Sequence, residues 1–304
     1  MKKFLIKFLL VVCPVVLPLV LMEVAVRHIP NNYNFKNDFM TSQSEGLETL
    51  IMGNSHGYLG INPEYLDTAA FNLCNLAESM DYTNKLYTKF DPQLNNLKTL
   101  VIPISYEGMF LKNMGVSRYN YNLYYDLKIN DYLVDNLEIL NGNWIDLITD
   151  CYSYYVDKTP SPYLQTSALG WFSEISDNKK FDYDRMEQLA LRDTNNDIAT
   201  LNYNIAIVKE LISKLQKKGI TLVMVSTPLH EGYRKFLDAN QLNLLKTSAQ
   251  QLADQSENVM YYNFMDSVLF EDSDFMDGDH LNTEGAAKFT RILNQLINLK
   301  TDLH

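Results

Sequence analysis

Five short apolar runs recur along this 304-residue chain, at 47–53, 69–74, 99–105, 221–227 and 259–264. Such runs are typical of strands that are buried on both faces of a parallel sheet. Amphipathic segments predict crossover helices at 81–90, 198–217, 233–255 and 283–299, the last with Asn282 as its N-cap. This alternation predicts an α/β fold, a three-layer α/β/α sandwich around a mainly parallel five-stranded sheet. Binding sites then lie at the carboxyl ends of the strands.

A longer apolar run precedes these segments, from Phe8 to Met22. With its apolar flanks it reaches the ~20 residues that cross a bilayer, so we expect residues 1–30 to form a membrane anchor. Three lysines precede the run, and the positive-inside rule then leaves the N-terminus in the cytoplasm and the body of the chain outside. Residues 22–27 make a poor cleavage site for a signal peptidase, which favours an uncleaved anchor.

The rest of the chain divides into a linker at 31–46 and a main domain at 47–304, and the Asn-rich segment 30–38 is predicted to be flexible. The interval 110–196 interrupts the strand–helix alternation and predicts a mostly helical insertion. Aromatic residues are frequent in it: Tyr119, Tyr121, Tyr124, Tyr125, Tyr132, Trp144, Tyr152, Tyr154, Tyr155, Tyr163 and Trp171. Aromatic faces stack on sugar rings, but they also pack insertions onto domains and gather at membrane interfaces, so both interpretations stay open.

Composition and charge argue against several function classes. The net charge of −11 disfavours binding to nucleic acid, because phosphate backbones attract basic surfaces. Three cysteines are too few for a disulfide framework or a four-cysteine zinc site. The acidic residues between 272 and 284 do not follow the calcium-binding EF-hand pattern, because Met276 stands where an acid or amide is needed. We expect no metal and no cofactor.

A serine between glycines follows the first predicted strand, in the segment Gly53-Asn54-Ser55-His56-Gly57. A tight turn at this point lifts the serine hydroxyl into the crevice at the end of the sheet, which makes Ser55 the candidate nucleophile. A serine hydroxyl is a weak nucleophile at neutral pH, whereas a neutral imidazole with a pKa near ~6.5 accepts its proton. Ser55 therefore needs a histidine.

Three histidines lie away from the chain ends: His56, His230 and His280. His280 is the best placed, because it comes after the last predicted strand and before the last predicted helix. Asp277, three residues earlier, can hold the Nδ1–H of this imidazole. We interpret Asp279 as a capping or solvent-facing residue. His56 and His230 are candidates for binding substrate, since both follow predicted strands.

These segments resemble the ordered motifs of the SGNH (GDSL-like) hydrolases. The matching residues are Gly53 to Ser55, Asn72 to Ala77, Ser105, and Asp277 to His280. The resemblance covers 47–299 apart from the insertion, and is closest to membrane-anchored members linked to bacterial cell-surface polysaccharides. It implies a flavodoxin-like sandwich at the bacterial cytoplasmic membrane, with the catalytic domain outside. It also implies a triad in which Ser55 is the nucleophile, His280 the base and Asp277 the orienting carboxylate.

The same resemblance implies an oxyanion hole made by the backbone N–H groups of Ser55 and Ala77 and the side chain of Ser105. The family has glycine at the second position and asparagine at the third, so this chain departs from the pattern at both. Asn75 is the alternative third donor. One missing donor typically costs ~10²–10³ in turnover.

The sequence thus predicts a serine-dependent esterase or O-acyltransferase acting on acyl groups of a cell-envelope glycan. Its expected partners are that glycan or another acylated small substrate, the membrane lipid around the N-terminal helix, and a membrane-bound acyltransferase. The alternative is a non-catalytic component of an acylation or export complex that uses the same fold to bind a glycan or a partner. The departure at Ser105 favours this alternative, whereas a reactive Ser55 contradicts it.

Overall fold

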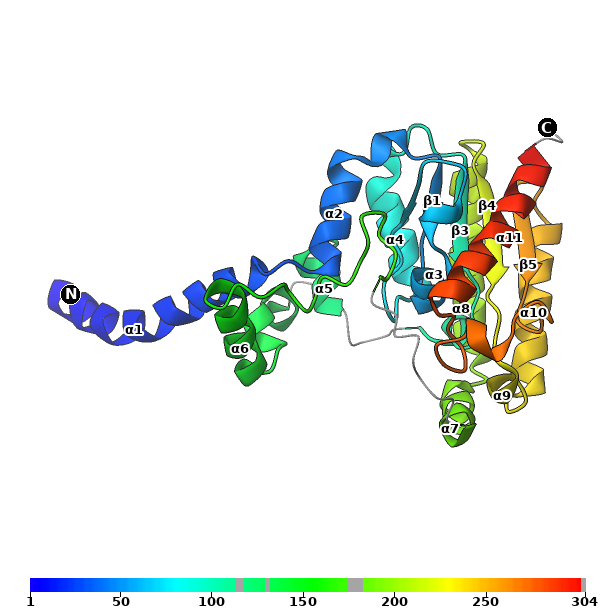
Figure 1. Cartoon of the computed structure of the whole chain (residues 1–304). Helices are drawn as coiled ribbons and strands as arrows, with labels where there is room; N and C mark the ends of the chain where they lie inside the picture. Colours follow the sequence, from blue (N-terminus) through cyan, green and yellow to red (C-terminus); the bar gives the residue numbers. More distant parts are fainter. Residues whose placement is uncertain (113–117, 129–131, 174–182, 302–304) are drawn as a thin grey trace. The chain divides into compact units, whose positions relative to one another are not determined.

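The computed structural model describes residues 1–112, 118–128, 132–173 and 183–301, and the chain forms two compact units (Figure 1). One comprises Met1–Asp38 and Ser117–Gln165, and we call it the anchor unit. The other comprises Phe39–Val116 and Thr166–His304, and we call it the sandwich unit. The insertion predicted at 110–196 is therefore shared between the two units.

A five-stranded parallel sheet forms the centre of the sandwich unit, in the order β2-β1-β3-β4-β5. Its strands are β1 (Thr49–Ile51), β2 (Ala70–Asn72), β3 (Thr99–Pro103), β4 (Thr221–Ser226) and β5 (Val259–Asn263). Each lies inside an apolar run that predicts it, so the predicted fold class is confirmed. The chain passes from β1 to β2 and then returns to β3 on the other side of β1. The strand order thus reverses at β1 and β3, and a ligand crevice is expected at their carboxyl ends.

Helices cover the sheet and complete the three layers seen in Figure 1. They include α3 (Ser55–Gly60), α4 (Met80–Phe90), α8 (Ile198–Gln216), α10 (Ala239–Asp254) and α11 (Thr283–Thr301). α3 packs on α11, and α4 packs on α8. Ile51, Val101 and Val223 of the strands share a buried core with Phe289 and Leu293 of α11. This α3–α11 layer positions the candidate site, because Ser55 begins α3 and His280 comes shortly before α11.

The helix predicted at 233–255 is two helices in the structure, α9 (Glu231–Arg234) and α10. Asp238 separates them with an extended backbone, φ −67° and ψ 123°. Its carboxylate accepts the N–H of Gln241 at 2.8 Å, and its own N–H donates to the hydroxyl of Tyr106 at 3.0 Å. Asp238 therefore caps a new helix, and this contact with a distant tyrosine is not visible in the local pattern.

The segment 30–38, predicted to be flexible, is helical from Asn32 onward. The linker segment 31–46 contains α2 (Asn32–Ser42) and a 3₁₀ turn (Ser44–Gly46). Phe39 stacks on Phe71 with ring centroids 3.8 Å apart, and Met40 is fully buried. The free energy of burying these two apolar side chains holds the segment in place in spite of its many asparagines.

The anchor unit begins with α1 (Lys2–Arg27). Its stretch Leu10–Arg27 has a mean hydropathy of 2.2 and is long and apolar enough to cross a membrane, a property that signal sequences share. The insertion adds α5 (Arg118–Leu123), α6 (Trp144–Tyr155) and 3₁₀ turns at Leu133–Asn136 and Glu138–Leu140. Its later part supplies α7 (Tyr183–Asp193) to the sandwich unit.

Candidate active site

Ser55 occupies the first position of α3, just beyond the carboxyl end of β1. Asn54 caps this helix, because its side-chain oxygen accepts the backbone N–H of His56 at 3.2 Å. The first residue of a helix has no intrahelical acceptor for its N–H. Ser55 therefore offers both a hydroxyl and a backbone donor at the edge of the sheet.

Two glycines let the chain make this turn against the neighbouring strands. Gly53 has a φ of 132°, and a Cβ there would lie 2.7 Å from Cδ of Pro103 on β3. A Cβ at Gly57 would lie 2.6 Å from Sγ of Cys74. Any larger residue at either position would push the turn away from the sheet, so the two glycines set the place of Ser55.

His280 meets Ser55 from the loop that leads into α11. Its Nε2 lies 2.9 Å from Oγ of Ser55, and its Nδ1 lies 3.1 and 3.2 Å from the two carboxylate oxygens of Asp277. Oδ1 of Asp277 also accepts the backbone N–H groups of Asp279 and His280, at 3.1 and 2.9 Å, which closes a tight turn. The structure thus brings together Ser55, His280 and Asp277, with the contacts that a nucleophile, a base and an orienting carboxylate require.

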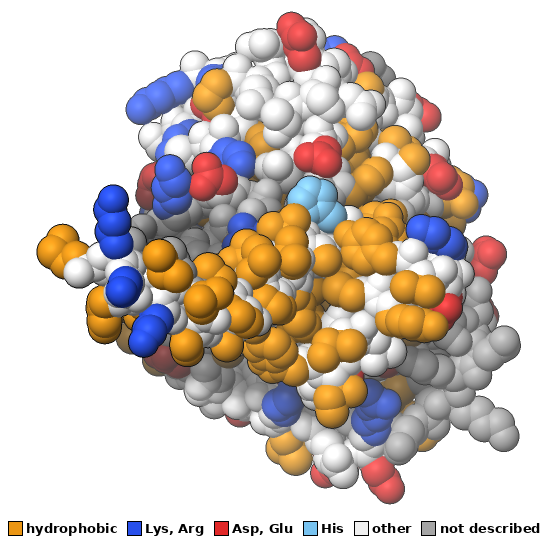
Figure 2. Space-filling model, turned by 90° about the vertical axis from the view of Figure 1, so that its left-hand side faces the viewer, with side chains coloured by type: hydrophobic (Ala, Val, Ile, Leu, Met, Phe, Trp, Pro, Cys, Tyr) orange, Lys and Arg blue, Asp and Glu red, His pale blue; other side chains and the backbone are white. Residues whose placement is uncertain are grey.

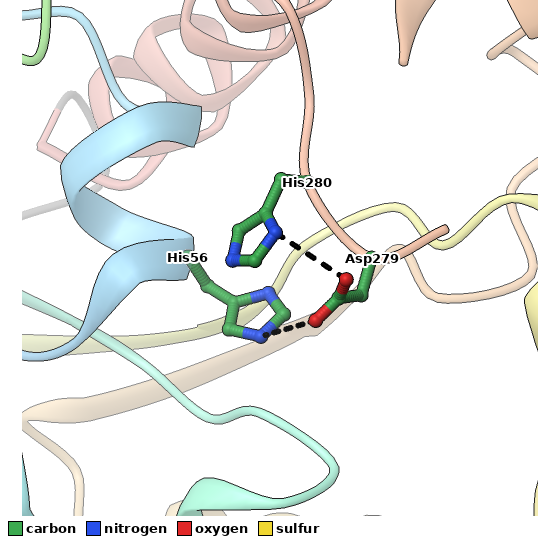
Figure 3. Close-up of side chains that lie close together, drawn as sticks. All are labelled: His56, Asp279 and His280. Atoms are coloured by element: carbon green, nitrogen blue, oxygen red, sulfur yellow. Dashed lines mark ion pairs between the residues drawn. The ribbon is translucent and has the colours of Figure 1, made fainter. Parts of the chain in front are cut away.

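Asp279 is a second carboxylate beside the same imidazole. Its side chain is only 6% exposed, and its two oxygens lie 3.3 Å from Nδ1 of His280 and 3.8 Å from Nε2 of His56 (Figure 3). The expectation of a capping or solvent-facing residue is therefore wrong, because the turn held by Asp277 directs this carboxylate inward. Its place next to His280 in the sequence was the available signal, but burial cannot be read from adjacency.

His56 lies beneath the site and pairs with a carboxylate that the sequence analysis did not single out. Its Nε2 is 3.2 Å from Oε1 of Glu107, and its Nδ1 is 3.0 Å from the hydroxyl of Thr227. Burial lowers the pKa of His56, but the charge and hydrogen bond of Glu107 outweigh burial, and this pKa is raised. Burial raises the pKa of Glu107, but the charge and hydrogen bond of His56 bring it down to about 2. The two form a largely buried pair, which is ionic when His56 is protonated.

The pKa of His280 is raised well above 6.5. Burial lowers it, but the negative charge of Asp279 and the hydrogen bonds with Asp277 and Asp279 outweigh burial. Burial raises the pKa of Asp277, but its hydrogen bond with His280 and the charge of that imidazole lower it overall. His280 is therefore a strong proton acceptor whose neutral form needs a higher pH than an ordinary histidine does.

The path of the backbone is similar to that in the crystal structure of a GDSL-like lipase. That structure, from Bacteroides thetaiotaomicron, is 10% identical with a TM-score of 0.43, and the match covers 89% of this chain and 100% of the lipase. A candidate acylhydrolase from Bacteroides fragilis is also 10% identical, with a TM-score of 0.42 and coverage of 88% and 95%. No family model and no curated protein matches the sequence. The chemistry of the site therefore rests on its own geometry.

Ser105 does not take the oxyanion position implied by the resemblance. Its hydroxyl accepts hydrogen bonds from Nδ2 of Asn54 at 2.7 Å and from the N–H of Gly108 at 3.1 Å, and donates to Glu107 at 2.9 Å. Ser105 is 3% exposed. It ties the nucleophile turn to Glu107 and so has a structural role.

The alternative donor, Asn75, is also engaged elsewhere. Its amide donates to the carbonyl of Leu73 at 3.2 Å and to the carboxylate of Glu78 at 2.8 Å. Ala77 borders the cavity in the left-handed conformation, with a φ of 54°, and no described residue is an acceptor for its N–H. Two backbone donors, from Ser55 and Ala77, are thus available to a developing oxyanion.

The site opens into a cavity of about 810 Å³ within the sandwich unit. Its apolar wall includes Leu59, Leu76, Phe172 and Met276, and Arg192 contributes a cation. Phe172 and Arg192 come from the later part of the insertion, which the sequence analysis left without a catalytic role. Periodicity alone does not show that this part folds back over the carboxyl edge of the sheet.

Neither histidine predicted to bind substrate borders this cavity. His230 is 2% exposed, its Nδ1 accepts the N–H of Gly232 at 2.9 Å, and its Nε2 lies 2.9 Å from Asp272. It therefore caps α9. His56 is 3% exposed and is held by the contacts described above. Both predictions are wrong for the same reason, because a strand-end position can face the interior as well as the crevice.

His56, Asp279 and His280 also offer ligand atoms within 4.8 Å of one another, as a metal site would. The nitrogens of His280 already contact Ser55 and Asp277, and Nε2 of His56 contacts Glu107. A metal ion on these atoms would compete with the proton-transfer contacts. The cluster therefore fits acid–base chemistry better than metal binding.

Proposed function

We propose that this chain is a serine-dependent esterase or O-acyltransferase that forms an acyl-enzyme on Ser55. The hydroxyl oxygen bonds to the acyl carbonyl carbon while His280 takes its proton, and the carbonyl electron pair becomes an oxyanion facing the N–H groups of Ser55 and Ala77. When the intermediate collapses, the C–O bond breaks and His280 returns the proton to the departing alcohol. Water or a sugar hydroxyl then releases the acyl group by the same steps in reverse.

One observation carries this proposal: Ser55, His280 and Asp277 form an unbroken line of contacts, with 2.9 Å between Oγ and Nε2, at the edge of a cavity. The resemblance of the ordered motifs to SGNH hydrolases supports the same roles. Asp279 supports the same chemistry, because a second carboxylate beside His280 stabilises the imidazolium that forms during attack.

For the substrate, we propose an acyl group on a cell-envelope glycan outside the bacterial cytoplasmic membrane. The apolar stretch of α1, with three lysines before it at the start of the helix, supports this location. The cavity is large enough for an acylated sugar, its leucine side chains suit an acyl chain, and the ring of Phe172 suits a sugar face. A membrane-bound acyltransferase is a suitable source of acyl groups if the reaction is transfer.

The test is labelling of the purified chain by a fluorophosphonate probe, which reacts with an activated serine. We expect wild type to be labelled, Ser55→Ala to be unlabelled, and Ser248→Ala, which removes a serine on α10, to be labelled like wild type. Labelling that survives in Ser55→Ala would assign the activity to another residue.

A non-catalytic module is the second candidate, and the engagement of both Ser105 and Asn75 favours it. With only two backbone donors, the oxyanion is less stabilised than in the family pattern. If folded wild type binds an acetylated glycan but gives neither probe labelling nor turnover, this candidate replaces the enzyme.

A further inference from the structure

Helix α6 of the anchor unit carries its large apolar side chains on the outside. Leu147 is the only buried residue among its twelve. Trp144, Ile145, Ile148 and Tyr152 are exposed, Ile145 by 74%, and together they form what we call the α6 surface. Figure 2 views the molecule from the α1 side and shows hydrophobic side chains gathered in a broad band. Exposed apolar patches of this kind usually mark an interaction site.

The polar residues of α6 are sorted away from this surface. Trp144, Ile148 and Tyr152 recur every four residues and therefore lie along one side of the helix. Asp146 and Asp150 fall on the opposite flank at 3.6 residues per turn, and Asp150 accepts a hydrogen bond from the hydroxyl of Tyr163. α6 contains no lysine or arginine. Its free side is thus apolar and aromatic, without the cations that anionic headgroups attract.

α6 packs beside the end of α1, within the same unit. The hydroxyl of Tyr155 donates to the carbonyl of Ala25 at 2.8 Å. The carboxylate of Glu23 accepts the N–H groups of Glu138 and Ile139 at 3.1 and 3.0 Å, and Glu23 is only 7% exposed. The insertion therefore shelters the one acidic residue of α1, which otherwise opposes entry into lipid.

The length of α1 places this contact at the level of the membrane boundary. The uncharged stretch Phe8 to Met22 spans only ~22 Å at ~1.5 Å per residue, whereas the hydrocarbon core is ~30 Å thick. A helix that crosses the core therefore needs residues beyond this stretch, and the candidate span Leu10–Arg27 includes the turns where Glu23 is sheltered and Tyr155 binds. Tryptophan and tyrosine concentrate at this depth in membrane proteins.

We infer that the α6 surface is a second membrane contact, seated at the boundary between headgroups and acyl chains of the bilayer that α1 crosses. The occupant is lipid, because the surface continues from the apolar α1 in the same unit. It requires no anionic lipid, since it offers no cation. This inference rests on the proposed insertion of α1 but not on the chemistry of Ser55.

The chain supplies its own reporter, because Trp144 and Trp171 are its only tryptophans. Trp171 belongs to the sandwich unit and is 6% exposed. The full chain is reconstituted into vesicles of phosphatidylcholine brominated on the acyl chains, either near the headgroup or near the methyl end. The Trp171→Phe variant keeps only Trp144. We expect bromines near the headgroup to quench at least half of its fluorescence, and bromines near the methyl end to quench less. In the Trp144→Phe variant, which keeps only Trp171, the quenched fraction should be several-fold smaller.

A charge on the α6 surface provides the matched test. Ile145→Lys adds a lysine at its most exposed position, so the fold is expected to tolerate it, and Asp146→Lys adds the same side chain on the opposite flank. In the Trp171→Phe background, Ile145→Lys should lose most of the quenching of Trp144 and Asp146→Lys should keep it, while both float with the vesicles through α1. A Trp171→Phe chain that carries no further substitution and floats with unquenched Trp144 would overturn the inference, as would one that does not float. Probe labelling of Ser55 separates either failure from a failure of the proposed catalysis.

Discussion

The sandwich unit and the anchor unit differ in the kind of side chain that is gathered in an unusual place. The sandwich unit gathers largely buried ionisable groups, with Glu107 and Asp279 at the wall of its cavity and His56 in contact with both. The anchor unit exposes large apolar groups, such as Ile145 and Ile148. Buried charges cost free energy unless they are paired, and exposed apolar surface loses the gain of burial unless something covers it. We propose that each departure serves a function, proton transfer in the sandwich unit and membrane contact in the anchor unit.

The largest expected effect is the loss of catalysis in variants of the sandwich unit. Ser55→Ala and His280→Ala should each lower kcat for a soluble acetyl ester by at least about 10³-fold, and the double variant should be scarcely worse, because the two residues act as one unit. Trp144 quenching in vesicles should be unchanged in all three variants. Steady-state kinetics and the quenching assay check both halves. Additive losses in the double variant would contradict a shared proton transfer.

The next largest effects should distinguish the two carboxylates beside His280. Asp277→Asn should lower kcat/KM by roughly 10²-fold or more, because an amide favours the wrong tautomer of the imidazole. Asp279→Asn should cost less, because Asp277 still holds the ring. The comparison of kcat/KM values for the two variants is the measurement. Equal losses would mean that Asp279 shares the orienting role.

The pH dependence of kcat/KM tests the electrostatic effect of Asp279 on His280. The active form of His280 is neutral and its pKa is raised, so activity should fall as the pH drops through a midpoint above 6.5. Asp279→Asn removes a negative charge that raises this pKa, so the midpoint should move to lower pH. A pH series with wild type and both variants checks this. A midpoint that Asp279→Asn leaves in place would contradict the electrostatic effect of Asp279.

The pair of His56 and Glu107 should affect the free energy of unfolding more than the turnover. Glu107 has a pKa lowered from 4.5 to about 2, so its contribution is present above pH 4.5 and is lost as the pH falls toward 2. His56 has a pKa raised above 6.5, so its contribution is present below 6.5 and is lost as the pH rises through the raised value. Glu107→Gln should therefore lower the free energy of unfolding most between about pH 4.5 and 6.5, by ~1–3 kcal/mol. Denaturant titrations across this range test the window, and a constant difference would refute it.

The smallest effect concerns Ser105. Since its hydroxyl supports Asn54 and Glu107 instead of an oxyanion, Ser105→Ala should change kcat only a few-fold and cost ~1 kcal/mol of stability. Kinetics and thermal melts are the measurements. A loss near 10²-fold in a well-folded variant would return Ser105 to the oxyanion hole.

The fold and the Ser55–His280–Asp277 contacts could be predicted because their signals are local. Buried strands appear as apolar runs, and the three-residue spacing of Asp277 and His280 fits one turn of chain. The partner of His56 could not be predicted, because Glu107 lies on another strand-end loop and meets it through tertiary packing. Two further features could not be predicted. The burial of Asp279 depends on how its turn packs, and the contact of Ser105 with Asn54 joins residues distant in sequence.

The nucleophile turn is fitted to the sheet through a single proline. A Cβ at Gly53 would meet Cδ of Pro103, and a Cβ at Gly57 would come within 3.3 Å of its Cγ as well as meeting Cys74. A larger residue at either glycine thus requires Pro103 or Cys74 to move. The insertion has a constraint of the same kind at Gly170, which has a φ of 80° and where a Cβ would lie 2.1 Å from the backbone oxygen of Asn72. A substitution at Gly53 or Gly57 therefore displaces Ser55 itself, whereas one at Gly170 displaces the insertion beside β2.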